Sequence, residues 1–172
     1  MRCLMSRLLD CDEFGWSASY RLLTLYDTTM GAEQFYDDAD RTKWLLPGPG
    51  VVFLQTPREV GTVRMRLESW SAEPPPSPGH WAGWEEVEVS FPDGHLGIQT
   101  VASGGRDTDL VLPSPGMYRT RWQWAFNPDA GPFTSPLDGS FGQPLDNPGG
   151  HEDALNGADQ FILVQMWPDA AA

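Results

Sequence analysis

Alternation of apolar with polar residues at period two is the sequence feature that most limits how this chain can fold. Residues 63–68 alternate strictly between apolar and charged side chains, which is typical of a strand with one face in water. Residues 84–91 and 117–124 repeat the pattern, and residues 96–99 resume it after an Asp-Gly turn, so we expect a hairpin there. Long helical patterns are scarce, which favours an all-β fold.

Four further segments complete the expected strands. Residues 51–54 and 161–164 are continuous apolar runs, as in strands that are buried on both faces. Residues 20–26 and 109–112 are the other two. About eight strands separated by Pro/Gly turns predict an antiparallel β-sandwich of the jelly-roll type. We expect at most one short helix, within residues 32–46.

The length of 172 residues suits one domain, and we expect residues 1–172 to form it. Residues 1–19 are expected as an N-terminal extension, and residues 127–159 as a long insert. The insert holds five prolines and six glycines and separates the last two strong strands. A loop of this length inside a compact domain usually has a function or is disordered.

Acidic residues dominate the charge. The chain has 24 Asp and Glu against 11 Lys and Arg, a net charge of −13. This balance argues against a protein that binds nucleic-acid phosphates or an anionic membrane, because both need clustered basic residues. Beyond Arg121 the chain has no Lys or Arg and seven acidic residues, most of them in the insert. The acidity is therefore concentrated there.

The sequence has no apolar segment of the kind that a signal peptide or a membrane-spanning helix needs, so we expect a cytoplasmic protein. Cys3 and Cys11 are its only cysteines, which is too few for a disulfide framework and the wrong spacing for a zinc site.

Motifs that carry chemistry are scarce. There is no Gly-x-Ser-x-Gly nucleophile motif and no phosphate-binding loop. His151-Glu152-Asp153 supplies the His-x-Asp half of a facial triad, but no second histidine follows it, so a solvated acidic loop is the expected alternative. We therefore assign no catalytic residue, metal ligand or cofactor, and whether the protein is an enzyme stays open.

The first functional hypothesis is a non-enzymatic protein that binds and neutralises a basic protein partner. Carboxylates of the densest acidic cluster and of the insert would make the contacts: Asp37, Asp38, Asp40, Asp138, Asp146, Glu152 and Asp153.

The second hypothesis is a small-molecule-binding protein or enzyme with an aromatic-lined pocket. Tyr118, Trp122 and Trp124 share one face of their expected strand and would line the pocket, with the insert as a lid. Packing in the core is the structural alternative for these rings. A third hypothesis, an assembly subunit, predicts self-association.

The order of several segments resembles a known family. Trp84-Glu-Glu-Val-Glu-Val-Ser-Phe-Pro, Gly94-His-Leu-Gly-Ile-Gln, Leu112-Pro-Ser-Pro-Gly-Met-Tyr118 and a last strand ending in Trp167-Pro168 follow one another. Over residues 20–168 this order is similar to the ComJ-like family of small bacterial β-sandwich proteins. In that family a Leu-Pro-x-x-Gly-x-Tyr corner precedes the penultimate strand. The resemblance implies a β-sandwich that inhibits a partner nuclease or acts as an immunity protein against a toxin.

Overall fold

The structure, a computed structural model, describes residues 5–31, 40, 42–58, 60–102, 104–130, 133–134, 141–142 and 149–170. The first half of the chain forms β1 (Leu8–Ser19), β2 (Leu22–Asp27), β3 (Leu45–Gly48), β4 (Val51–Gln55), β5 (Val60–Trp70) and β6 (Gly83–Phe91). The second half forms β7 (His95–Thr100), β8 (Gly104–Val111), β9 (Gly116–Phe126), the 3-10 helix η1 (Pro128–Ala130), β10 (Phe133–Thr134), β11 (Phe141–Gly142), α1 (Glu152–Leu155) and β12 (Gln160–Pro168).

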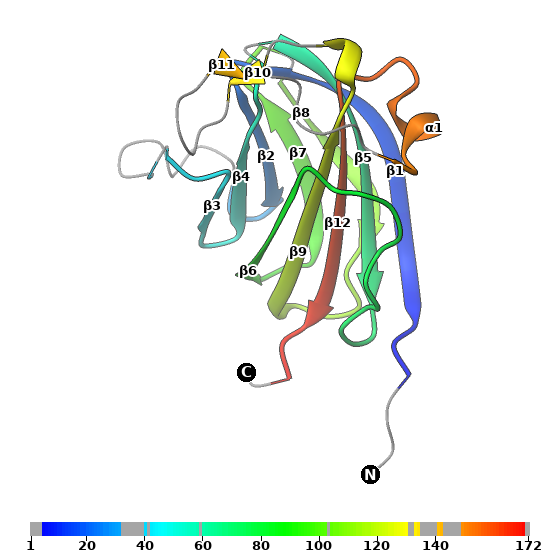
Figure 1. The fold of residues 1–172 in the computed structure, drawn as a ribbon. Helices are drawn as coiled ribbons and strands as arrows, with labels where there is room; N and C mark the ends of the chain where they lie inside the picture. Colours follow the sequence, from blue (N-terminus) through cyan, green and yellow to red (C-terminus); the bar gives the residue numbers. More distant parts are fainter. Residues whose placement is uncertain are drawn as a thin grey trace.

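Hydrogen bonds join ten of these strands into one sheet, which curls into a nearly closed, barrel-like shape (Figure 1). Its order is β3-β4-β2-β1-β5-β12-β9-β6, with β7 paired to β2 and β8 paired to β7. The β1–β2 link is the single pair Ser19↔Leu22. The all-β prediction is confirmed, but the count of about eight strands was too low. The two separate sheets of a sandwich are not confirmed, because the hydrogen bonds form one continuous sheet.

The hairpin that we expected at residues 92–95 does not form. β6 pairs with β9, whereas β7 pairs with β2 and β8. The turn amides of Asp93 and Gly94 instead donate to the Oδ2 atom of Asp27, at 2.9 and 3.0 Å. The Asp-Gly turn is therefore present, but it connects two distant parts of the sheet.

Other differences concern the chain before residue 50. The residues expected as an N-terminal extension include β1, which pairs with β5 along its whole length. Leu45 and Leu46, placed by the sequence at the end of a helix, belong to β3. Residues 32–39 and 41 of that expected helix lie outside the described residues. The short α-helix α1 lies in the insert.

Side chains close the barrel-like sheet between β1 and β8. Asp12 Oδ2 accepts a hydrogen bond from the Asp109 amide at 2.9 Å, and Asp10 Oδ2 accepts one from the Val111 amide at 3.3 Å. Arg106 of β8 lies 4.5 Å from the centre of the Phe14 ring of β1. Carboxylates of one strand thus take the place of backbone carbonyls as acceptors for the other.

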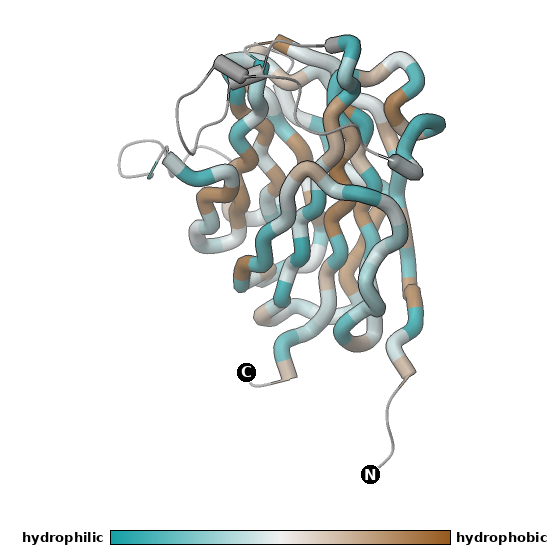
Figure 2. The backbone as a smooth tube through the Cα atoms, viewed as in Figure 1, coloured by the Kyte–Doolittle hydropathy of each residue, from teal (hydrophilic) through white to brown (hydrophobic). Residues whose placement is uncertain are grey.

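The core lies inside the sheet, and β12 is buried on both faces. Its inward side chains join the main core cluster, and the outward side chains of Phe161 and Leu163 form a second cluster with Leu155 and Trp81. Figure 2 shows apolar and hydrophilic residues alternating along several strands, as one wet face requires. The two runs that we predicted to be buried on both faces, in β4 and β12, are confirmed.

Candidate partner-binding surface

α1 presents two of the predicted contact acids, Glu152 and Asp153, as exposed side chains. The preceding His151 is buried, with its imidazole 4.0 Å from the Trp81 ring and 5.7 Å from the Phe161 ring between ring centres. Burial lowers the pKa of His151, although the charge of Glu152 opposes the shift, so the imidazole is neutral at pH 7. His151 therefore anchors the helix and leaves its carboxylates in solvent.

The His-x-Asp run does not gather its side chains around one point, since His151 is buried and Asp153 is exposed. No group of three or more His, Cys, Asp or Glu side chains that could hold a metal ion occurs in the part of the chain that the structure describes.

Asp40 lies apart from α1. It precedes β3, and Figure 1 shows β3 and α1 on opposite sides of the view. Its Oδ1 atom accepts hydrogen bonds from the Thr42 hydroxyl at 2.6 Å and the Thr42 amide at 3.1 Å, which lower the pKa of Asp40. The remaining predicted contacts lie outside the described residues: Asp37, Asp38, Asp138 and Asp146. The predicted acids that are described thus form no single cluster.

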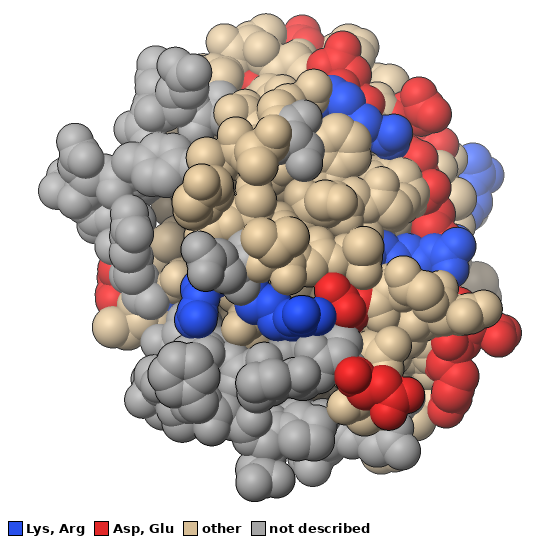
Figure 3. All heavy atoms as spheres, turned by 90° about the horizontal axis from the view of Figure 1, so that it is seen from above, with Lys and Arg blue, Asp and Glu red and all other residues tan. Residues whose placement is uncertain are grey.

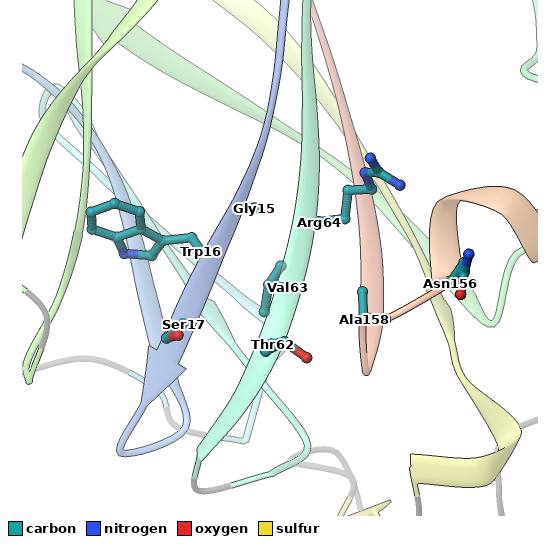
Figure 4. A pocket seen from close by; sticks show the side chains of 9 residues that line it. Gly15, Trp16, Ser17, Thr62, Val63, Arg64, Asn156 and Ala158 are labelled. Atoms are coloured by element: carbon teal, nitrogen blue, oxygen red, sulfur yellow. The ribbon is translucent and has the colours of Figure 1, made fainter.

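An open groove of about 450 Å³ lies beside α1. Its floor is the outer face of β1 and β5, where Gly15, Ser17 and Thr62 leave little side-chain volume. Arg64 and residues 156–158, which connect α1 to β12, form its wall (Figure 4). A groove of this size accommodates a side chain or a short segment of a partner.

Acidic residues border this groove. Glu13 Oε1 lies 3.2 Å from Arg64 Nε, and the backbone carbonyl of Asp153 accepts a hydrogen bond from Arg64 at 3.3 Å, which places α1 with its two exposed carboxylates beside the groove. At the other end, Asp159 Oδ2 accepts one from the Thr62 amide at 2.9 Å. Figure 3 shows acidic side chains on the right, interspersed with Lys or Arg side chains, on the side where Figure 1 places β1 and α1. The acid-bordered groove is therefore the best-formed candidate for a contact with a basic protein.

The turn between β1 and β2 is strained. Its central residues Tyr20 and Arg21 have φ angles of 54° and 59°. Positive φ at both positions is the geometry of a type I′ hairpin turn, which favours Asn and Gly. A side-chain-bearing residue costs about 1 kcal/mol there. The sequence predicted a strand over these residues, because neither Tyr nor Arg signals a turn.

Tyr20 of this turn and two nearby valines are exposed apolar residues, and we call them the end patch. Tyr20, Val60 and Val101 have 65%, 64% and 53% of their surface exposed. Ser19 connects them. Its Cα pairs with Val60, and its Oγ atom accepts a hydrogen bond from the amide of Ala102 at 2.9 Å. No sequence motif marks this patch, because strands that are distant in the sequence bring its residues together.

The three aromatic residues proposed for a ligand pocket lie in the core. Tyr118, Trp122 and Trp124 are 1%, 0% and 2% exposed. The Tyr118 hydroxyl donates to the Ser114 carbonyl at 2.7 Å, and Trp122 Nε1 donates to the Thr120 hydroxyl at 3.0 Å. Their shared face on β9 is confirmed, and each ring has a packing role there.

The barrel-like sheet defines an all-β protein with a ComJ-like fold. Similar solved structures include Crocagin biosynthetic gene J, with 18% sequence identity, a TM-score of 0.58, and coverage of 93% of this chain and 97% of that chain. They also include ComJ from Bacillus subtilis, an inhibitor of the DNA degrading activity of NucA. Its identity is 12%, its TM-score is 0.58, and the match covers 96% of this chain and 99% of that chain. At these identities the likeness shows the fold alone.

No protein-family model and no curated protein matches the chain. Within the described residues, no helix could span a membrane, since α1 has only four residues.

Proposed function

We propose that this chain is a non-enzymatic inhibitor that binds and neutralises a basic protein partner of the nuclease type. The observation that carries the proposal is the fold likeness to ComJ, an inhibitor of a DNA-degrading activity, over nearly the whole length of both chains. The net charge of −13 supports it independently. Packing of Tyr118, Trp122 and Trp124 in the core supports this function over an internal ligand pocket.

The contact surface in this proposal is the acid-bordered groove. A nuclease presents a basic cleft to DNA phosphates, and carboxylates of an inhibitor can occupy the place of those phosphates. Glu152 and Asp153 supply exposed charges of this kind beside the groove, whereas Glu13 is paired with Arg64 and Arg66. Opposite charges also speed the encounter, and salt weakens that effect.

The proposal also includes the number of domains, the location of the protein and the remaining acidic contacts. We infer one domain that acts in the cytoplasm, where an immunity protein would meet the toxin encoded beside it. Asp37, Asp38, Asp40, Asp138 and Asp146 remain proposed contacts, with Asp40 in a second contact because it lies apart from α1.

The test is a DNA-degradation assay in which the full-length protein is titrated against NucA and against any nuclease encoded beside its own gene. We expect inhibition to be complete near a one-to-one ratio and to weaken as NaCl rises from about 50 to about 500 mM. Glu152→Gln combined with Asp153→Asn should weaken inhibition about 10-fold, as expected for loss of two charges at a contact.

Glu88→Gln is the matched control, because Glu88 is an exposed acid on β6, away from the groove. It should leave inhibition unchanged. Undiminished DNA degradation with every nuclease at a molar excess of wild-type protein would overturn the proposal.

A further inference from the structure

We propose that the strained Tyr20–Arg21 turn, together with Val60 and Val101, is the anchor that inserts into an apolar pocket of the partner. This inference rests on the proposed function and names the part of the surface that dominates the affinity. Its partner is a basic protein that has an apolar pocket for Tyr20 and the two valines, and Lys or Arg side chains opposite the acids of the groove.

The strain itself is the first observation. Tyr20 and Arg21 occupy left-handed backbone positions at φ 54° and 59°, where Asn or Gly would be relaxed. Packing in the core does not explain why tyrosine occupies position 20, since 65% of the surface of Tyr20 is exposed. Strained positions concentrate at sites where function needs a particular side chain.

The turn is also held rigid. The Arg21 carbonyl accepts a hydrogen bond from the Thr56 amide at 2.9 Å, and Ser19 accepts one from the Ala102 amide at 2.9 Å. A side chain on a fixed turn loses little conformational freedom when it binds. Tyrosine is among the residue types that most often dominate the energy of protein interfaces.

The end patch continues into the acid-bordered groove. Val60 and Thr62 are two residues apart in β5, so their side chains lie on the same face of the sheet. Their partners on β1 are Ser19 and Ser17, respectively. Thr62 and Ser17 line the groove, whose border includes Glu13 and acids near α1. Protein interfaces usually combine an apolar core with a polar rim, and here the acids lie to one side of the end patch, along the groove. These acids match the basic partner.

The test uses the nuclease that wild-type protein inhibits in the assay above. Tyr20→Asn combined with Arg21→Gly puts favoured residues into the turn, so the melting temperature should rise while inhibition weakens about 30-fold or more. Val60→Thr and Val101→Thr should each weaken inhibition several-fold. Val111→Thr is the matched control: Val111 is 47% exposed at the end of β8, and this change should leave inhibition unaltered.

Tyr20→Ser, which removes the aromatic ring and leaves Arg21 in place, is measured alongside. The result therefore does not depend on whether the double variant keeps its fold. Wild-type inhibition by a folded Tyr20→Ser protein would overturn the anchor and leave the inhibitor function standing. Absence of inhibition by the wild-type protein would instead overturn the proposed function and the anchor together.

Discussion

Asp27 shows how one buried carboxylate organises several connections. Its side chain accepts hydrogen bonds from the amides of Asp93 and Gly94 and from both the amide and the hydroxyl of Thr29. Burial alone would raise the pKa of Asp27, but these hydrogen bonds outweigh it and hold the pKa below its ordinary value. The carboxylate thus fixes the end of β2 against the β6–β7 turn.

We therefore expect Asp27→Asn to destabilise the protein by about 2–3 kcal/mol at pH 7, because an amide group faces donors that need a charged acceptor. Since the folded pKa is lowered, this contribution is present above the unfolded value of about 3.9 and is lost as the pH falls through the folded value. Urea denaturation at pH 7 and about pH 3 measures it. An equal difference in unfolding free energy between variant and wild type at both pH values would contradict this origin. Asp129→Asn, at an exposed position, is the control.

Individual residues were predictable from the sequence where a local pattern carries the information. The alternation in residues 117–124 placed Tyr118, Trp122 and Trp124 on one face of their strand, as observed, although it did not show that this face lies in the core. Asp27 and Asp93 are 66 residues apart. No local pattern announces such a bond, and the same holds for the end patch.

At the scale of elements, His151 links α1 to the Pro-rich segment before β6. The His80 amide donates to the Gly149 carbonyl at 2.9 Å, and the His151 ring packs on Trp81. A Cβ atom on Gly79 would come within 2.5 Å of His151 Nε2, so only glycine permits this approach. These contacts, which we call the His151 latch, join two connecting segments that are far apart in the sequence.

This latch should depend on pH. Because burial lowers the pKa of His151, the packed ring is neutral, and its contribution is complete above the unfolded value of about 6.5 and is lost as the pH falls below it. We expect amides in residues 79–82 and 149–155 to exchange faster at about pH 5 than at about pH 7.5, after correction for intrinsic rates. His151→Gln should abolish this difference. Equal protection at both pH values in the wild type would refute the latch.

The sequence predicted most strands but missed β1 for a physical reason. Asp10 and Asp12 lie in β1, where their carboxylates hydrogen-bond the amides of β8. These acids interrupt the apolar alternation that identifies a strand. At residues 92–95 the turn amides likewise bond a side chain, that of Asp27, and the two flanking strands pair with other neighbours. The alternation of apolar and polar residues does not predict where polar side chains replace backbone groups as hydrogen-bond partners.

For the whole molecule, the contact between β1 and β8 decides how fully the sheet closes. We expect Asp12→Ala to destabilise the protein by about 1 kcal/mol and to speed hydrogen exchange of the Asp109 amide, because that amide loses its acceptor. Asp12→Asn keeps a carbonyl acceptor and should have a smaller effect. Exchange of the Asp109 amide at the wild-type rate in Asp12→Ala would show that the seam does not depend on this carboxylate.

Strand order is the least predictable property at this scale. The alternation in residues 63–68 predicts a strand but not its neighbours, which are β1 and the distant β12. Surface charge was predictable as a total, whereas its placement around the groove follows from which strands become neighbours.

The position of β12 has a consequence for biosynthesis. β12 lies between β9 and β5, antiparallel to the first and parallel to the second, yet it follows every other strand in the chain. While a ribosome is still adding residues 160–168, the central edges of β5 and β9 have no strand between them. Folding of the sheet therefore waits until translation has passed this segment, and a nascent chain that stalls earlier exposes two apolar edges to chaperones and to its neighbours.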